Sequence, residues 1–233
     1  MCFVHSLRRC SDVLCDISSR FRCITHPRST SVTHPQTAQS TTYDFFMLVL
    51  QYAPALCADQ KCNLTPDSSA WSLHGLWPTK NDGSYPSYCT TQKFDPSSVT
   101  PILPELNAHW FSISGPNSSF WAHEYEKHGV CAEDLLPKEL DFFNRTLNLR
   151  TQYDITPALA AHGISPSATE GFSRVDFDEA TLTAFSFKVL PACDTKGNLL
   201  GAVVCISKGF VAQSCGSTTY GTCTADTLYL MPA

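Results

Sequence analysis

Charged residues make up only 16% of this chain, and no apolar run approaches the roughly 20 residues that a membrane-spanning helix needs. Hydrophobic residues account for 43% of the 233 positions, so the chain can build a sizeable core and is not of the disordered class. Basic residues are also scarce. The net charge is −5, whereas a general nucleic-acid-binding protein is usually basic, so any contact with nucleic acid should be confined to a local cleft. We expect no membrane association.

No Cys-x-x-Cys pair occurs in the chain, although it contains 12 cysteines. This absence argues against a structural zinc site, which commonly uses such a pair. Four cysteines lie in residues 1–40, and eight lie beyond them: Cys57, Cys62, Cys89, Cys131, Cys193, Cys205, Cys215 and Cys223. An even set of this size indicates a disulfide framework formed in an oxidising compartment, although the number alone does not fix the pairing.

Residues 1–40 contain no lysine, five arginines and eleven serines or threonines. Because they show no hydrophobic periodicity, we expect a transit segment, a pro-segment or another non-mature extension, followed by one domain over 41–233. Asn63, Asn117 and Asn144 each begin a glycosylation triplet. With the cysteines, these triplets favour a secreted protein or one in the lumen of a vacuole, lysosome or endoplasmic reticulum.

The strongest apolar run, residues 45–50, imitates a signal peptide when it is taken with the small residues at 55–58. It is only six residues long and begins 44 residues into the chain, so a buried strand is the better interpretation. Further patterns predict loops at 63–70 and 79–101, helices at 101–111, 120–130, 133–149, 156–162 and 178–183, and strands at 184–190, 199–207 and 227–231. Mixed elements without regular alternation indicate an α+β fold, with an antiparallel β-sheet core flanked by several helices and stapled by disulfides.

Two short segments concentrate chemically active side chains. Residues 71–78 (WSLHGLWP) place His74 near Trp77, and residues 120–131 (FWAHEYEKHGVC) hold His123, Glu124, Lys127 and His128. On a helix over 120–130, the last four side chains fall within one arc of about 140° and could address one cleft. Trp121 and Tyr125 lie on the adjoining side and would anchor the helix in the core.

The second segment superficially matches the zinc-protease pattern His-Glu-x-x-His. The position four after His123 is Lys127, whose ammonium group cannot ligate zinc, so we expect no metal and no cofactor. Two histidines can instead hold opposite protonation states near pH 6.5 and serve as base and acid, while a lysine neutralises a phosphorane. A single histidine is more often structural, and His5, His26, His34, His109 and His162 are assigned to that class.

Together the two segments resemble the signatures of the ribonuclease T2 family, and the likeness extends over about residues 43–233. The resemblance implies metal-independent cleavage of single-stranded RNA, but not of DNA, through a 2′,3′-cyclic phosphate with low base specificity. It implies His128 as the first base and His74 as the first acid, with Glu124 and Lys127 stabilising the transition state. His123 would hold phosphate, Trp77 and Tyr85 would stack the base on the 5′ side of the cut, and Phe120 would contact the next base.

The resemblance also implies the disulfides Cys57–Cys62, Cys89–Cys131, Cys193–Cys223 and Cys205–Cys215. The chain departs from some fungal members at Thr79, where they have an aspartate that recognises adenine. We expect a monomeric ribonuclease for RNA turnover or scavenging. Two alternatives remain open: a non-catalytic storage, recognition or signalling relative on the same fold, and a metallohydrolase.

Overall fold

A computed structural model describes residues 42–58, 62, 64, 68–216 and 223–232. The expected extension over 1–40 and the glycosylation triplet at Asn63 lie outside this part of the chain. Its centre is a five-stranded antiparallel sheet with the order β2-β1-β5-β4, and β6 pairs with the edge of β5. These strands span Trp71–Thr79 (β2), Phe45–Tyr52 (β1), Leu199–Ser207 (β5), Leu190–Cys193 (β4) and Ala212–Gln213 (β6).

Every residue of β1 is buried, which explains why its sequence is continuously apolar over 45–50 instead of alternating. The strand lies between β2 and β5, so both of its edges are paired. The structure therefore confirms the predicted buried strand at 45–50. One irregularity interrupts its pairing with β2: Val49 pairs with Gly75 and Leu50 with Leu73, so His74 is the extra residue of a β-bulge.

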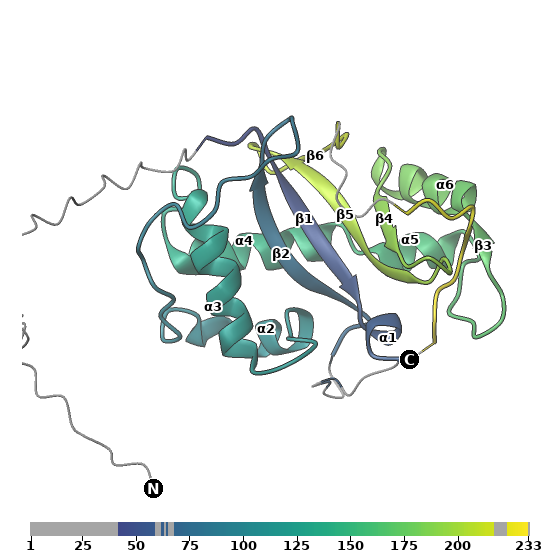
Figure 1. The fold of residues 1–233 in the computed structure, drawn as a ribbon, viewed down its shortest axis with the longest axis horizontal. Helices are drawn as coiled ribbons and strands as arrows, with labels where there is room; N and C mark the ends of the chain where they lie inside the picture. The colour runs from purple at the N-terminus through teal and green to yellow at the C-terminus, as the bar shows by residue number, and fades with distance from the viewer. Residues whose placement is uncertain (1–41, 59–61, 63, 65–67, 217–222, 233) are drawn as a thin grey trace, which may run out of the picture. The chain divides into compact units, whose positions relative to one another are not determined.

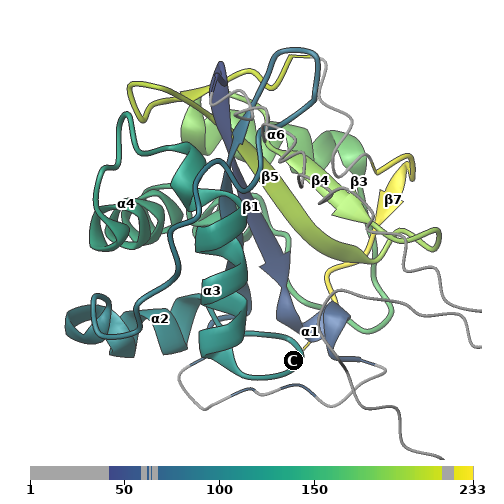
Figure 2. The same cartoon turned by 60° about the vertical axis from the view of Figure 1, so that its left-hand side comes forward.

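Several helices flank the sheet (Figures 1 and 2). They are α1 (Ala53–Leu56), α2 (Leu103–His109), α3 (Asn117–Lys127), α4 (Glu139–Gln152), α5 (Ile155–Ala161) and α6 (Arg174–Phe185), with short 3₁₀ turns at Thr100–Ile102 and Gly129–Cys131. The helix α4 packs against β1 and β2, and α2 and α3 lie on the β2 side. A small second sheet pairs β3 (Phe172–Ser173) with β7 (Thr227–Leu228). The α+β prediction is confirmed.

The predicted strand at 184–190 is wrong. A capping box between Ser173 and Asp176 begins α6, which continues to Phe185, and β4 starts only at Leu190. The alternating pattern has another cause: Phe185 and Phe187 both pack against Tyr153, with ring centroids 5.8 and 5.6 Å away. A turn through the left-handed residue between them brings both rings to the same partner.

Two other element boundaries are corrected. The helix expected at 133–149 begins at Glu139, because Pro137 disfavours helical geometry in the residue before it. The helix expected at 120–130 begins earlier, at Asn117, and ends at Lys127. The strand expected at 227–231 is paired in the small sheet only over Thr227–Leu228.

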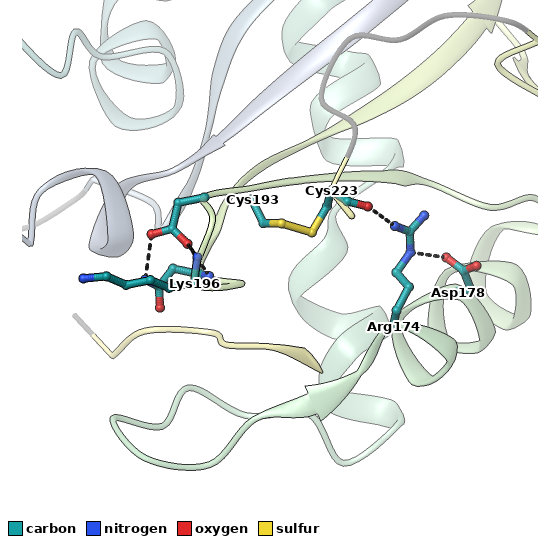
Figure 3. The surroundings of a disulfide bond; sticks show 7 residues. Arg174, Asp178, Cys193, Lys196 and Cys223 are labelled. Atoms are coloured by element: carbon teal, nitrogen blue, oxygen red, sulfur yellow. Dashed lines mark hydrogen bonds and ion pairs between the residues drawn. A yellow bond between two sulfur atoms is a disulfide. The ribbon is translucent and has the colours of Figure 1, made fainter. Parts of the chain in front are cut away.

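All four implied disulfides are present, so the pairing is confirmed. Cys193–Cys223 joins β4 to the C-terminal segment, as Figure 3 shows. Beside it, Arg174 of α6 donates from Nη1 to the carbonyl oxygen of Cys223 at 3.0 Å and from Nε to Asp178 at 3.1 Å. Within the described residues, no helix combines the length and the apolar character that crossing a bilayer requires.

Candidate active site

The strand β2 supplies His74 and Trp77 to one face of the sheet. The bulge at His74 redirects this side chain out of the regular alternation, and β-bulges often have this role beside active sites. The backbone at this point is also fixed from the helical side, since the indole N–H of Trp110 donates to the carbonyl oxygen of His74 at 2.9 Å. Sequence reasoning missed Trp110, because no local pattern shows that it contacts residue 74.

The helix α3 supplies Phe120, His123, Glu124 and Lys127, while Trp121 and Tyr125 are buried in the core as predicted. His128 lies outside the regular helix. It is the C-cap residue, with φ −116° and ψ −47°, and a 3₁₀ turn follows it. The single helical arc expected for all these side chains is therefore wrong for His128, whose direction is set by the end of the helix.

The two imidazoles of His74 and His128 converge on the indole ring of Trp77. The His128 ring stacks on it, with centroids 4.9 Å apart and an interplanar angle of 18°. The His74 ring meets it edge-on, with centroids 5.1 Å apart and an angle of 86°. Segments 54 positions apart in the sequence thus place both candidate proton carriers on one side chain.

Glu124 completes this cluster. One carboxyl oxygen, Oε2, accepts a hydrogen bond from the indole N–H of Trp77 at 2.8 Å, and the other, Oε1, lies 3.6 Å from Nε2 of His74. Gly75 makes this approach possible, because a Cβ at this position would collide with both the Glu124 carboxyl group and the Trp77 indole. The glycine of the first motif is therefore required by the site, a role that sequence reasoning did not identify.

Burial dominates the electrostatics of the cluster. It raises the pKa of Glu124, which is 1% exposed, to about 8, although the Trp77 hydrogen bond and the Lys127 charge oppose the shift. Burial lowers the pKa of His74 to about 4, and the charges of His123 and Lys127 add to this. At neutral pH the 3.6 Å contact between His74 and Glu124 therefore joins a neutral imidazole and a protonated carboxyl group, and is not a salt bridge.

Burial also lowers the pKa of His128 far below its ordinary value, and the charges of Lys127, His123 and His74 lower it further. The ring is 2% exposed, and its Nδ1 has no hydrogen-bond partner in the described structure. A neutral imidazole is suited to accept a proton. The pKa of His123 is lowered as well, by partial burial and by Lys127.

The remaining predicted residues surround this centre. Tyr85 lies in the loop after β2, is 49% exposed and faces His128 with ring centroids 5.9 Å apart. The ammonium group of Lys127 lies 5.7 Å from the centre of the Tyr85 ring. On the other side, Phe120 meets the His74 ring at 5.5 Å. His123 is exposed on α3, and no contact places it directly against the two imidazoles.

The Tyr85 loop is fastened to the end of α3 at two points. The backbone N–H of Tyr88 donates to the carbonyl oxygen of Lys127 at 3.0 Å, and Cys89 is bonded to Cys131. Tyr88 adopts a left-handed φ of 52°, which is uncommon for a residue with a side chain. These ties hold the aromatic loop beside the catalytic candidates.

Beyond His74 and Phe120, a groove of about 630 Å³ extends over the sheet. Its floor comes from β1, β5 and β4, and its walls come from the 112–116 segment, the start of α3 and Leu56 of α1. Thr79, the departure from the fungal pattern, does not line this groove. Its hydroxyl is buried and donates to the carbonyl oxygen of Trp77 at 2.9 Å.

Within the described part of the chain, no three His, Cys, Asp or Glu side chains gather closely enough to hold a metal ion. Two glycosylation candidates can also be placed. The amide of Asn117 accepts from the Ser112 N–H and donates to Asn107, and Asn144 lies within α4 two residues before the buried Thr146. Modification at either position stays a prediction.

Comparison with known proteins agrees with this arrangement. The sequence model of the Ribonuclease T2 family matches residues 43–226. Ribonuclease DdI of Dictyostelium discoideum is 35% identical over 179 residues, which cover 76% of this chain and 80% of that protein. Extracellular ribonuclease LE of Solanum lycopersicum is 32% identical over 176 residues, covering 70% and 76%. A solved structure of a variant of RNase MC1, a protein of bitter gourd seeds, in complex with 5′-GMP superimposes with a TM-score of 0.68 at 28% identity, covering 81% of this chain and all of that one.

Proposed function

The chain belongs to the ribonuclease T2 family and is a ribonuclease, and on this basis we propose that it cleaves single-stranded RNA by transesterification without a metal ion. The observation that supports this most directly is the convergence of His74 and His128 on Trp77, with Glu124 3.6 Å from His74. Two proton carriers on opposite sides of one reacting phosphate are what the reaction requires.

In the first step, the neutral imidazole of His128 removes the proton from the ribose 2′-OH. The 2′-oxygen then attacks phosphorus, and a pentacoordinate phosphorane forms. Because burial keeps His128 neutral, the base is ready over a wide pH range. The reaction uses a hydroxyl group that DNA lacks, so DNA should not be cut.

The bond from phosphorus to the 5′-oxygen then breaks, and this oxygen needs a proton. His74 donates this proton, and the protonated Glu124 beside it replaces the proton on the imidazole and becomes a carboxylate. With a pKa of about 8, Glu124 retains this proton at neutral pH and can replenish the imidazole. Lys127 offsets the additional negative charge of the phosphorane, and His123 contributes a hydrogen-bond donor to it. The products are a 2′,3′-cyclic phosphate and a free 5′-hydroxyl group.

In the second step, the roles of the two histidines exchange. Neutral His74 removes a proton from water, the hydroxide attacks the cyclic phosphate, and protonated His128 returns its proton to the 2′-oxygen. A 3′-phosphate is released, the proton on His74 returns to Glu124, and all three groups recover their starting states.

Base recognition depends on ring faces more than on hydrogen bonds. Tyr85, with half of its surface exposed, provides the platform for the base on the 5′ side, and Trp77 forms the wall behind it. Phe120 contacts the base on the 3′ side. Because every base has a stacking face, such contacts tolerate any sequence and fit low base specificity.

We propose a secreted or lumenal protein that acts as a monomer in RNA catabolism. Four disulfides and the extracellular tomato relative support this location. The deciding experiment is turnover of a fluorescent homopolymer RNA in excess EDTA, with the products analysed for cyclic phosphate. Full activity and a transient cyclic product are expected. Loss of activity that added divalent metal restores would refute the metal-free mechanism, and RNA binding without any product would indicate a non-catalytic relative.

A further inference from the structure

The groove beside His74 is longer than one nucleotide needs. It crosses the sheet from β2, which holds His74, over β1 and β5 to Ala192 of β4. Three strand spacings separate the ends of this path, or about 14 Å at 4.8 Å for each spacing. A base in contact with Phe120 lies at the β2 end of this path, because the rings of Phe120 and His74 are 5.5 Å apart. The part of the groove over β5 and β4 extends beyond it.

The far part of the groove is chemically different from the catalytic centre. Its lining includes Leu56, Ala192, Leu200 and Ala202, and none of the described residues that line the groove is lysine or arginine. The few polar groups are serines of the 112–119 segment and Gln51, whose Nε2 is already bonded to the carbonyl oxygen of Phe111 at 3.1 Å. An apolar surface without cations suits the face of a nucleobase and does not suit a phosphate.

The proposed roles of the histidines set the direction of the RNA strand, and this inference rests on that proposed function. His74 protonates the leaving 5′-oxygen, so the nucleotide released with a free 5′-hydroxyl lies on its side of the phosphate. His74 lines the groove, whereas Glu124, Lys127 and His128 do not appear among the described lining residues. The strand on the 3′ side of the cut must therefore enter the groove.

We propose that the β5–β4 end of the groove is a separate subsite for the second nucleobase on the 3′ side of the cut. The base packs on Leu200 and Ala192, beyond the position next to Phe120. The site takes any base, because the contacts are apolar and not directed by hydrogen bonds. It makes the protein prefer internal linkages of a longer strand over terminal dinucleotides.

Chimeric substrates isolate this subsite, because only a linkage that follows a ribose can be cut. We would compare kcat/KM for a uridine ribonucleotide followed by one deoxyadenosine with that for the same substrate bearing two. The longer substrate should react roughly 10-fold faster, as expected from burial of one more base face. A third substrate with an abasic second position should lose this gain while keeping the added phosphate. A fourth, extended on the 5′ side, should not show it.

Substitutions in the groove test which residues cause the faster cleavage of the longer chimera. Leu200→Gln and Ala192→Gln should abolish most of the gain and leave cleavage of the shorter substrate unchanged, which also reports correct folding. Leu182→Gln is the matched control, since Leu182 is 46% exposed on α6. The gain should persist between 50 and 300 mM salt, because no counterion is released by an apolar contact.

Equal rates for the two chimeras, or an equal gain from the abasic substrate, would overturn the proposal. If a variant is misfolded, the comparison of substrates on the unaltered protein still decides. Failure to cut even the shorter chimera and RNA homopolymer would count against the proposed function instead, so the two failures can be distinguished.

Discussion

The indole N–H of Trp77 donates a hydrogen bond to the buried carboxyl group of Glu124 at 2.8 Å, while the same ring stacks on His128. One side chain thus touches the base candidate with its face and the proton reservoir with its edge. At 9% exposed, Trp77 has little surface left for a nucleobase. Its main contribution is to position the two catalytic candidates.

Trp77→Phe tests this relationship. Phenylalanine keeps a ring beside His128 but removes the donor that holds the pKa of Glu124 down, so the pKa should rise further. We expect kcat/KM to fall roughly 10-fold, as for loss of one hydrogen bond to a buried ionisable group, and the basic limb of its pH profile to move upward. Trp121→Phe is the matched control, because its indole N–H donates to a core carbonyl oxygen instead. An unchanged basic limb in the Trp77 variant would contradict the positioning role.

Replacing either proton carrier should stop turnover. His74→Phe and His128→Phe keep a flat ring in place but cannot transfer protons, and each should reduce kcat by about 10² or more. His162→Phe provides the comparison, since His162 is exposed at the C-cap of α5. Single-turnover assays on RNA would measure the effect. A near-normal rate for either site variant would remove that histidine from the mechanism.

The pH dependence of kcat/KM should reflect the unusual environment of the cluster. Glu124 holds the acid proton up to a pKa of about 8, so activity should decline above this pH. The lowered pKa of His128 keeps the base neutral in mild acid, so the acidic limb should lie well below pH 6.5. Glu124→Gln should be slower and should lack the limb near pH 8. A profile centred on two ordinary histidine pKa values would contradict this description.

Stability should show the cost of burying Glu124. Its pKa is raised from 4.5 to about 8 on folding, so the folded state binds the extra proton and the free energy of unfolding falls as pH rises through this window. The free energy of unfolding of Glu124→Gln, taken relative to that of the unaltered protein, should therefore be higher at pH 8.5 than at pH 5 by on the order of 3 to 4 kcal/mol. Urea unfolding at both pH values measures this difference. The same change at exposed Glu179 should give less than about 0.5 kcal/mol.

The Cys89–Cys131 bridge should matter for both stability and rate. It closes a loop with a sequence separation of 42 residues, and the loop-closure entropy of the unfolded chain gives about 4 kcal/mol. Replacing both cysteines by serine should lower stability by up to this amount and raise KM, because the loop with Tyr85 loses a tie to α3. Removing Cys57–Cys62, which spans 5 residues, is the comparison and should cost less. An equal loss of stability and an equal rise in KM for the two variants would contradict the role of Cys89–Cys131 in holding the Tyr85 loop.

The sequence alone determined the chemistry that is available and much of the framework. Two motifs predicted His74, Glu124, Lys127 and His128 as catalytic candidates, the length and composition of 45–50 indicated a buried strand, and family resemblance predicted the pairing of the cysteines. These features are local, or they repeat a known pattern, so they are visible without coordinates. The strand predicted at 184–190 was wrong because its pattern has a non-local cause. Phe185 and Phe187 alternate because both contact Tyr153, which lies at the end of α4.

Only the tertiary structure decided how the motifs meet. The bulge at His74, the end of α3 before His128 and the absent side chain of Gly75 together bring two segments onto one indole ring. The shifted pKa values follow from burial among residues that are distant in sequence. The position of Trp77 and the groove across β1, β5 and β4 likewise depend on contacts between distant segments. Proton affinity depends on the surrounding dielectric and charges, and packing in three dimensions sets both of these.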